Sequence, residues 1–214
     1  DEAGQQAVVR PSTRFLRGNV RGMPGSRVAI SVTDDGKIAG LARDGYATWK
    51  IAPRPHDGAL EGVMLEEGED LAPSNFRCGA EDLPDLQILQ PEPLAMQQPL
   101  PPLALTGDEF FQITVAIETD YEFFQIFGDA QAAATYIGNL FNYINSIYEE
   151  ETKTRLVVGD VFLWSSYSQP WIENSKTSCR LYEFGRYWRD NRAGVERTVA
   201  HFLSGRSLGG GIAW

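Results

Sequence analysis

The N-terminal part of the chain alternates apolar and polar residues in short runs that are separated by turn signals. Alternation with a period of two is typical of strands that have one buried face. Asp35-Gly36 and Asp44-Gly45 stand between such runs, and tight hairpin turns require a positive φ that glycine adopts readily. Residues 14–51 are therefore predicted to form a β-meander, with a further strand over 61–65. We assign residues 1–85 to a β-rich domain.

Prolines and glutamines dominate the next stretch, residues 86–106. Its prolines are Pro91, Pro93, Pro99, Pro101 and Pro102. Proline stiffens a chain toward the extended polyproline II conformation, so this stretch is predicted to be an exposed linker between two domains. Because no Lys or Arg occurs between Arg77 and Lys153, we expect the linker to be cut by proteases that prefer apolar residues.

A different pattern begins after the linker. In FFQITVAIETD, apolar Ile113, Val115 and Ile117 alternate with smaller or polar residues, which predicts a strand. A helix is predicted after Asp129, a residue type favoured as an N-cap. Apolar residues then recur at spacings of four and three, as on one face of a helix. They are Ala133, Ile137, Leu140, Ile144 and Ile147.

The remainder of the chain repeats this order of elements. TRLVVGDVFLW is predicted to be a second strand, residues 178–191 a helix, and RTVAHFLSG a third strand. Strands that alternate with helices favour a mostly parallel sheet covered by helices. The fold class expected for residues 107–214 is therefore α/β, or α+β when the β-rich N-terminal domain is included.

Composition narrows the classes of function. Hydrophobic residues make up 43% and charged residues 22% of the 214 residues, as in folded domains. The formal net charge of -10 argues against nucleic acid or an anionic membrane surface as a partner. No apolar run approaches the roughly 20 residues that span a bilayer. Two cysteines, Cys78 and Cys179, are too few for a disulfide framework.

The sequence holds few candidates for catalysis. It contains no HExxH, GxSxG, P-loop or GxGxxG motif, and His56 and His201 show no metal-ligand spacing with the cysteines. We expect His201 to have a structural role in its strand. The acidic pair Glu118 and Asp120, and the run 149–151, can bind a cation or act as acid and base, but solvated strand and helix ends are the favoured interpretation. The glycines at 209–211 favour a close backbone approach or a flexible loop over a phosphate site.

Several segments together resemble one family. VAHFLSGRSLGGGIAW, FQITVAIETDYEFFQIFGDAQAAATYIGNLFNYINSIYE, RLVVGDVFLW, Trp171 and LYEFGRYW occur in the order found in adamalysin-type, or reprolysin-like, metzincins. Upstream, FLRGNVRGMPGSRVAISVTDDGKIAGLARDGYATWKI resembles the β-rich propeptide of that family, and NFRCGAEDLP resembles its inhibitory cysteine segment. The resemblance covers roughly nine tenths of the chain.

The resemblance implies a secreted, zinc-dependent metalloendopeptidase that acts on protein or peptide substrates. Residues 107–214 would be the N-terminal half of its catalytic domain. The HExxHxxGxxH helix, whose histidines hold zinc and whose glutamate activates water, is expected downstream of Trp214. The fragment itself should then be inactive and should pair with its own downstream catalytic half. Thr114 stands where the family carries a calcium-binding glutamate, so that calcium site is not expected.

The resemblance also assigns roles within this chain. Cys78 is expected to act as the inhibitory cysteine, a thiolate that replaces water as the fourth zinc ligand, with Arg77 favouring the thiolate. A disulfide with Cys179 or with a downstream cysteine, and an inert thiol, are the alternatives. Gly211, Ile212, Ala213 and Trp214 are expected to begin an edge strand that pairs with an extended substrate peptide. The alternative is that Ile212 and Trp214 are core residues.

A second class of function fits the same residues. The chain could belong to a non-catalytic secreted protein, in which a β-rich domain and a degenerate protease-like domain serve adhesion, binding or inhibition. Sequence beyond Trp214 separates the two hypotheses, because only a peptidase needs the HExxH motif.

Overall fold

The structure is a computed structural model that describes residues 4–8, 10–54, 57–65, 77–78, 109–172, 176–208 and 210–213. The chain divides into two compact units. The first unit comprises Asp1–Leu71, Phe110–Gln169 and Glu196–Gly205, and the second comprises Ala72–Glu109, Pro170–Val195 and Arg206–Trp214. The N-terminal strands thus share a unit with the first part of the metzincin-like region. The linker predicted at residues 86–106 lies outside the described residues, and its boundaries stay a prediction.

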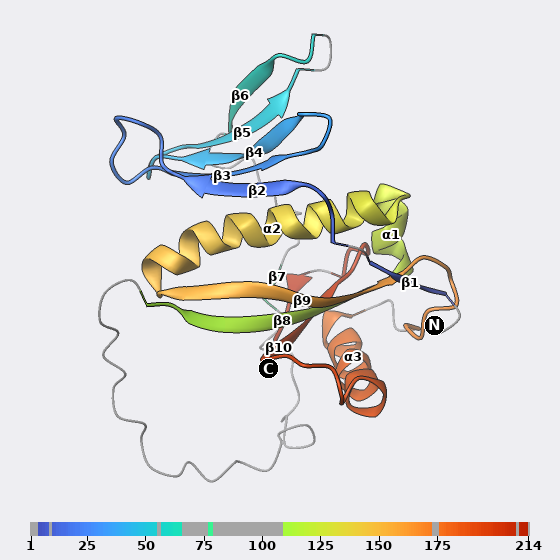
Figure 1. Ribbon diagram of the computed structural model, residues 1–214. Helices are drawn as coiled ribbons and strands as arrows, with labels where there is room; N and C mark the ends of the chain where they lie inside the picture. Colours follow the sequence, from blue (N-terminus) through green and yellow to red (C-terminus); the bar gives the residue numbers. More distant parts are fainter. Residues whose placement is uncertain are drawn as a thin grey trace, which may run out of the picture. The chain divides into compact units, whose positions relative to one another are not determined.

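The N-terminal strands form the predicted meander. Each strand pairs antiparallel with the next one along the chain, so that sequence order is also spatial order (Figure 1). The strands are β2 (Arg14–Gly18), β3 (Arg27–Val32), β4 (Ile38–Arg43), β5 (Thr48–Pro53) and β6 (Leu60–Leu65). Gly36 and Gly45 have φ values of 80° and 97°, in the left-handed region that both predicted turns require. Both hairpins are confirmed.

A second, four-stranded sheet lies at the centre of the first unit. Its order is β1-β9-β8-β10, with bounds β1 (Gln5–Ala7), β9 (Thr154–Trp164), β8 (Phe111–Thr119) and β10 (Val199–Leu203). β8 pairs parallel with both β9 and β10, whereas β1 pairs antiparallel with β9. The sheet is therefore mixed, and the expected α+β class is confirmed. β1 was not expected from the sequence.

Two helices follow β8 in immediate succession. Asp120 caps α1 (Tyr121–Phe127) by accepting a 2.7 Å hydrogen bond from the Phe123 N–H. Gly128 ends this helix at φ 67°. Asp129 then caps α2 (Ala130–Glu151), accepting from the Ala132 N–H at 2.8 Å. The predicted long helix is confirmed, while α1 is an additional element.

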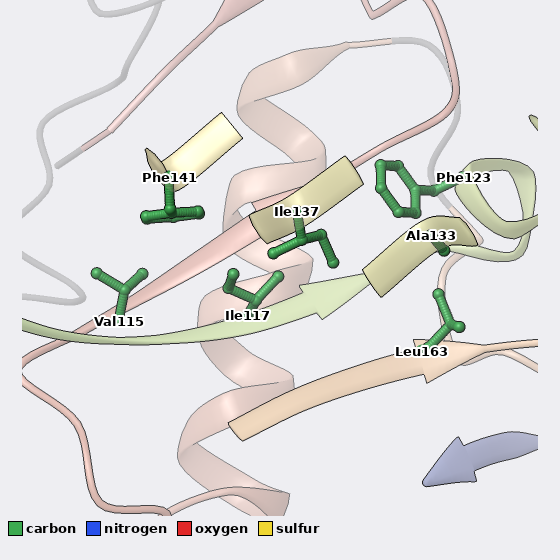
Figure 2. Close-up of a cluster of buried hydrophobic side chains, with 7 residues drawn as sticks. All are labelled: Val115, Ile117, Phe123, Ala133, Ile137, Phe141 and Leu163. Carbon is green, nitrogen blue, oxygen red and sulfur yellow. The ribbon is translucent and has the colours of Figure 1, made fainter. Parts of the chain in front are cut away.

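The core of the first unit lies between α2 and the central sheet. Figure 2 shows Ala133, Ile137 and Phe141, the apolar face of α2, directed at side chains from the sheet and from α1. The cluster is completed by Val115, Ile117, Phe123 and Leu163. All seven residues are buried, so α2 owes its position mainly to apolar contact with β8 and β9. No helix among the described residues is long and apolar enough to cross a membrane.

The second unit is built around α3 (Thr177–Asn191), close to the helix predicted over 178–191. Aromatic side chains form its core. Trp171 lies edge-on to Tyr187 at 4.9 Å between ring centroids, and Phe184 lies 5.7 Å from Trp188. Two short strands, β7 (Arg77–Cys78) and β11 (Gly210–Gly211), pair with each other in the same unit.

Candidate substrate-binding edge and cysteine segment

The cysteine segment and the glycine-rich segment near the end of the chain meet in the second unit. β7 pairs parallel with β11, with Arg77 opposite Gly210 and Cys78 opposite Gly211. These strands lie more than 130 residues apart in sequence. Glycine suits a position that another backbone approaches closely, because it carries no Cβ. Gly210 and Gly211 thus lie in a short strand that pairs with another segment.

The chain that enters β11 is held by α3. The Thr177 hydroxyl, in the first turn of the helix, donates a 2.5 Å hydrogen bond to the Leu208 carbonyl. The Ile172 N–H donates to Glu183 Oε1 at 2.9 Å, which ties the chain before α3 to the same helix. α3 therefore provides a fixed support beside the paired strands.

The four residues expected to bind substrate have different places. Gly211 lies in β11 and is exposed. Ile212 is half-buried and Ala213 is exposed, and both follow the strand rather than extend it. Trp214 lies outside the described residues. Their roles in substrate binding stay a prediction.

Cys179 lies on α3 and has an exposed, free thiol. A disulfide between Cys179 and Cys78 is therefore not formed in this structure. Cys78 lies in β7, and its assignment as the inhibitory cysteine stays a prediction.

No group of three His, Cys, Asp or Glu side chains that could hold a metal ion occurs in the part of the chain that the structure describes. His201 lies on β10, edge-on to the Phe141 ring at 6.4 Å. Its ring stays partly exposed, but desolvation by neighbouring protein lowers its pKa. These contacts fit the structural role expected for His201. His56 lies outside the described residues.

Glu118 and Asp120 are not the solvated strand end that the sequence favoured, because both are fully buried. Glu118 Oε1 accepts hydrogen bonds from Trp164 Nε1 at 2.7 Å and from Gln5 Nε2 at 3.0 Å. Asp120 accepts from the Gly205 N–H at 2.9 Å and from the Ser204 hydroxyl, besides capping α1. Glu118 thus links β8 to β9 and β1, and Asp120 links the start of α1 to the segment after β10.

The acidic run at the end of α2 also has partners. Glu149 lies 3.0 Å from Arg17 Nη2 and 2.6 Å from Arg155 Nε. Glu150 and Glu151 lie 2.5 and 3.2 Å from the Arg27 guanidinium. The run is therefore an ion-pair cluster, not a cation site. Thr114, at the expected calcium position, instead accepts the Thr198 N–H with its carbonyl at 2.8 Å.

Residues 111–214 match the metallo-peptidase family M12, of the reprolysin type. A human (Homo sapiens) relative, "Disintegrin and metalloproteinase domain-containing protein 22", is 27% identical over 187 residues, which cover 82% of this chain and 20% of the relative. The chain thus spans about a fifth of the length of that relative.

Residues 111–214 are thus similar in sequence to reprolysin-type metallo-peptidases of family M12. The resemblance predicted from the sequence is therefore confirmed for this half of the chain, and the human relative extends the similarity into the N-terminal region.

Proposed function

We propose that this chain is the N-terminal part of a secreted zymogen of a zinc-dependent metalloendopeptidase, which hydrolyses peptide bonds in proteins. In this proposal, the residues before Phe111 act as an inhibitory propeptide. The observation that carries the proposal is the pairing of Arg77 and Cys78 with Gly210 and Gly211. It joins the segment that resembles an inhibitory cysteine segment to the segment that resembles the substrate-binding edge.

The pairing supports inhibition by direct competition. We propose that substrate adds to the side of β11 on which β7 lies, where it would use the same backbone N–H and C=O groups as β7. β7 already pairs along that strand. In this proposal substrate and β7 compete for the same edge of β11, and the Cys78 thiolate would complete the block as a ligand of the zinc.

The described residues do not fit a complete zinc site, because they bring no three ligand side chains together. The resemblance assigns the three histidines and the water-activating glutamate to sequence that follows Trp214. The contribution proposed for this chain is therefore limited to Cys78 as a ligand in the latent protein, and to the scaffold that supports β11.

The experiment uses the longer protein that contains this chain. We expect one zinc ion per molecule, together with hydrolysis of a denatured protein substrate once the chain is cut before Phe111 and the N-terminal fragment is removed. Zinc loading and hydrolysis that both survive in the uncut protein would contradict inhibition by the N-terminal residues. A longer protein without zinc or hydrolysis would contradict the peptidase itself and would favour the non-catalytic binding module.

A further inference from the structure

The outer face of α2 carries residues that do not serve the central core. Thr135, Gly138, Asn142 and Glu149 follow one another at spacings of three, four and seven, which places them along one stripe of the helix. The core residues Ala133, Ile137 and Phe141 are instead directed at the central sheet and α1 (Figure 2). α2 is thus buried on two faces, and its second partner is the meander.

Gly138 is the centre of this contact. A Cβ at position 138 would lie 2.2 Å from Cζ of Phe15 and 2.8 Å from Cε1 and Cε2, so the Phe15 ring occupies the space that any other side chain needs. Glycine inside a helix costs about 1 kcal/mol relative to alanine. The contact with Phe15 is the physical reason for a glycine in the middle of this long helix.

Asn142 fixes two strands of the meander at once. Its buried side-chain amide donates hydrogen bonds of 3.2 Å to the carbonyls of Leu16 and Ile30, which are paired residues of β2 and β3. Thr13 and Thr135 add a contact of 3.4 Å between their hydroxyls, just before β2 begins. The meander is therefore held in one register against the helix.

The end of α2 adds charge complementarity. Arg17 on β2 and Arg27 on β3 point to the same acidic run, with Arg17 pairing with Glu149 and Arg27 with both Glu150 and Glu151. Ion pairs of this exposure are individually weak and are screened by salt. Their effect is to make the contact depend on ionic strength.

The chain before β2 is anchored at a separate place. β1 extends the central sheet by pairing antiparallel with the end of β9, and Val8 packs against the central core cluster. The Gln5 amide also donates to the buried Glu118. The added strand forms hydrogen bonds with backbone N–H and C=O groups that an edge strand otherwise leaves unpaired. The N-terminal residues therefore contact the rest of the first unit at two places, through the meander on α2 and through β1 on β9.

We propose that the outer stripe of α2 and the edge of β9 form a docking surface that keeps the N-terminal segment, residues 1–65, bound after the chain is cut behind β6. The partner that fits this surface is an antiparallel β-ribbon with an aromatic residue in its first strand and arginines opposite the acidic helix end. Cleavage alone then does not release the segment. This inference rests on contacts within the first unit and is independent of peptidase activity.

The test inserts a recognition site for a sequence-specific protease between Gly68 and Glu69 of the full chain. After cutting, we expect both fragments to elute together from a gel-filtration column at about 10 µM protein and about 50 mM NaCl. Fragments that separate under these conditions would overturn the inference. Elution is the readout, so a failure of the proposed peptidase function leaves this result unchanged.

Variants locate the docking surface. Gly138→Leu displaces Phe15, so the cut fragments should separate, whereas Gly194→Leu at an open, exposed glycine should leave them together. If Gly138→Leu prevents folding, the double variant Arg17→Glu with Arg27→Glu provides the second test. At low salt, we expect the dissociation constant between its two cut fragments to rise at least about tenfold. Retention that neither Gly138→Leu nor the charge reversal weakens would contradict α2 as the docking surface.

Discussion

The side-chain amide of Asn145 makes two hydrogen bonds with the backbone of Leu156, donating to its carbonyl at 2.8 Å and accepting from its N–H at 2.7 Å. Leu156 lies on β9, and β1 covers that strand only from Phe162 to Trp164. Asn145 therefore takes the place of a neighbouring strand along the part of β9 that β1 does not cover. It fixes α2 along the strand direction as well as against the sheet.

The first prediction follows from this pair. Asn145→Ala leaves both backbone groups of Leu156 without their partner and should lower the free energy of unfolding by about 2–3 kcal/mol. Asn145→Asp keeps one acceptor but places a carboxylate oxygen against the Leu156 carbonyl, so it should not restore stability. Urea unfolding followed by circular dichroism measures both. Asn139→Ala on the same helix is the control, and an equal loss in the control would refute the explanation.

The two helix caps provide a second prediction. Asp129 is exposed and accepts one backbone hydrogen bond, so Asp129→Ala should cost about 1 kcal/mol. Asp120 is fully buried and also holds Ser204 and Gly205, so Asp120→Ala should cost at least about twice as much. The comparison needs only the midpoints and slopes of urea unfolding. Equal losses in the free energy of unfolding for the two variants would mean that the link between Asp120 and residues 204–205 adds no stability.

A third prediction concerns Gly205, which follows β10. A Cβ here would lie 2.3 Å from the Glu122 carbonyl carbon and 2.4 Å from the Phe123 nitrogen, both backbone atoms at the start of α1. Because backbone cannot move aside as a side-chain tip can, Gly205→Ala should destabilise the protein by about 2–4 kcal/mol. Gly194 has open space around it, so Gly194→Ala should change stability by less than about 0.5 kcal/mol. A tolerated alanine at position 205 would show that α1 does not pack against this turn.

The fourth prediction is a pH dependence. Desolvation lowers the pKa of His201 below its ordinary value of 6.5, so the unfolded chain binds this proton more readily than the folded one. The stability linked to His201 is therefore complete above pH 6.5 and is lost as the pH falls through the lowered pKa. Arg27 lowers the pKa of Glu150, which keeps that carboxyl ionised throughout this window.

Unfolding free energies measured between about pH 7.5 and 5 test this linkage. His201→Gln should flatten the curve in that range, while His56→Gln should retain the slope of the unchanged protein. If the free energy of unfolding of His201→Gln keeps the same dependence on pH, the proton taken up on unfolding binds to another residue.

Local patterns predicted much of the fold. The hairpin signals at Asp35-Gly36 and Asp44-Gly45 correspond to the observed turns, and Asp129 caps the long helix as expected. These features depend on residues close together in sequence, so a single chain contains the information. The colinear motifs after Phe111 likewise identify the family from the sequence alone, because their order along the chain is itself the signal.

Contacts between distant segments were missed. β1 is only three residues long, and its partner β9 lies about 150 residues away, so no local pattern marks it as a strand. The burial of Asp120 was missed for the same reason, because two of its donors come from residues 204–205. A local signal did exist, since an aspartate between a strand and an aromatic run is a possible N-cap.

Cys78 provides the most direct test of the proposed latency, because β7 places it opposite Gly211 of the candidate substrate edge. The measurement is the initial rate of peptide hydrolysis by the longer, uncut protein with Cys78→Ala, compared with Cys179→Ala as the matched control. We expect Cys78→Ala to raise the rate at least about tenfold, and Cys179→Ala, which removes an exposed free thiol on α3, to leave the protein latent. Latency that persists in Cys78→Ala, while cutting the chain before Phe111 and removing the N-terminal fragment does release activity, would contradict Cys78 as the inhibitory residue.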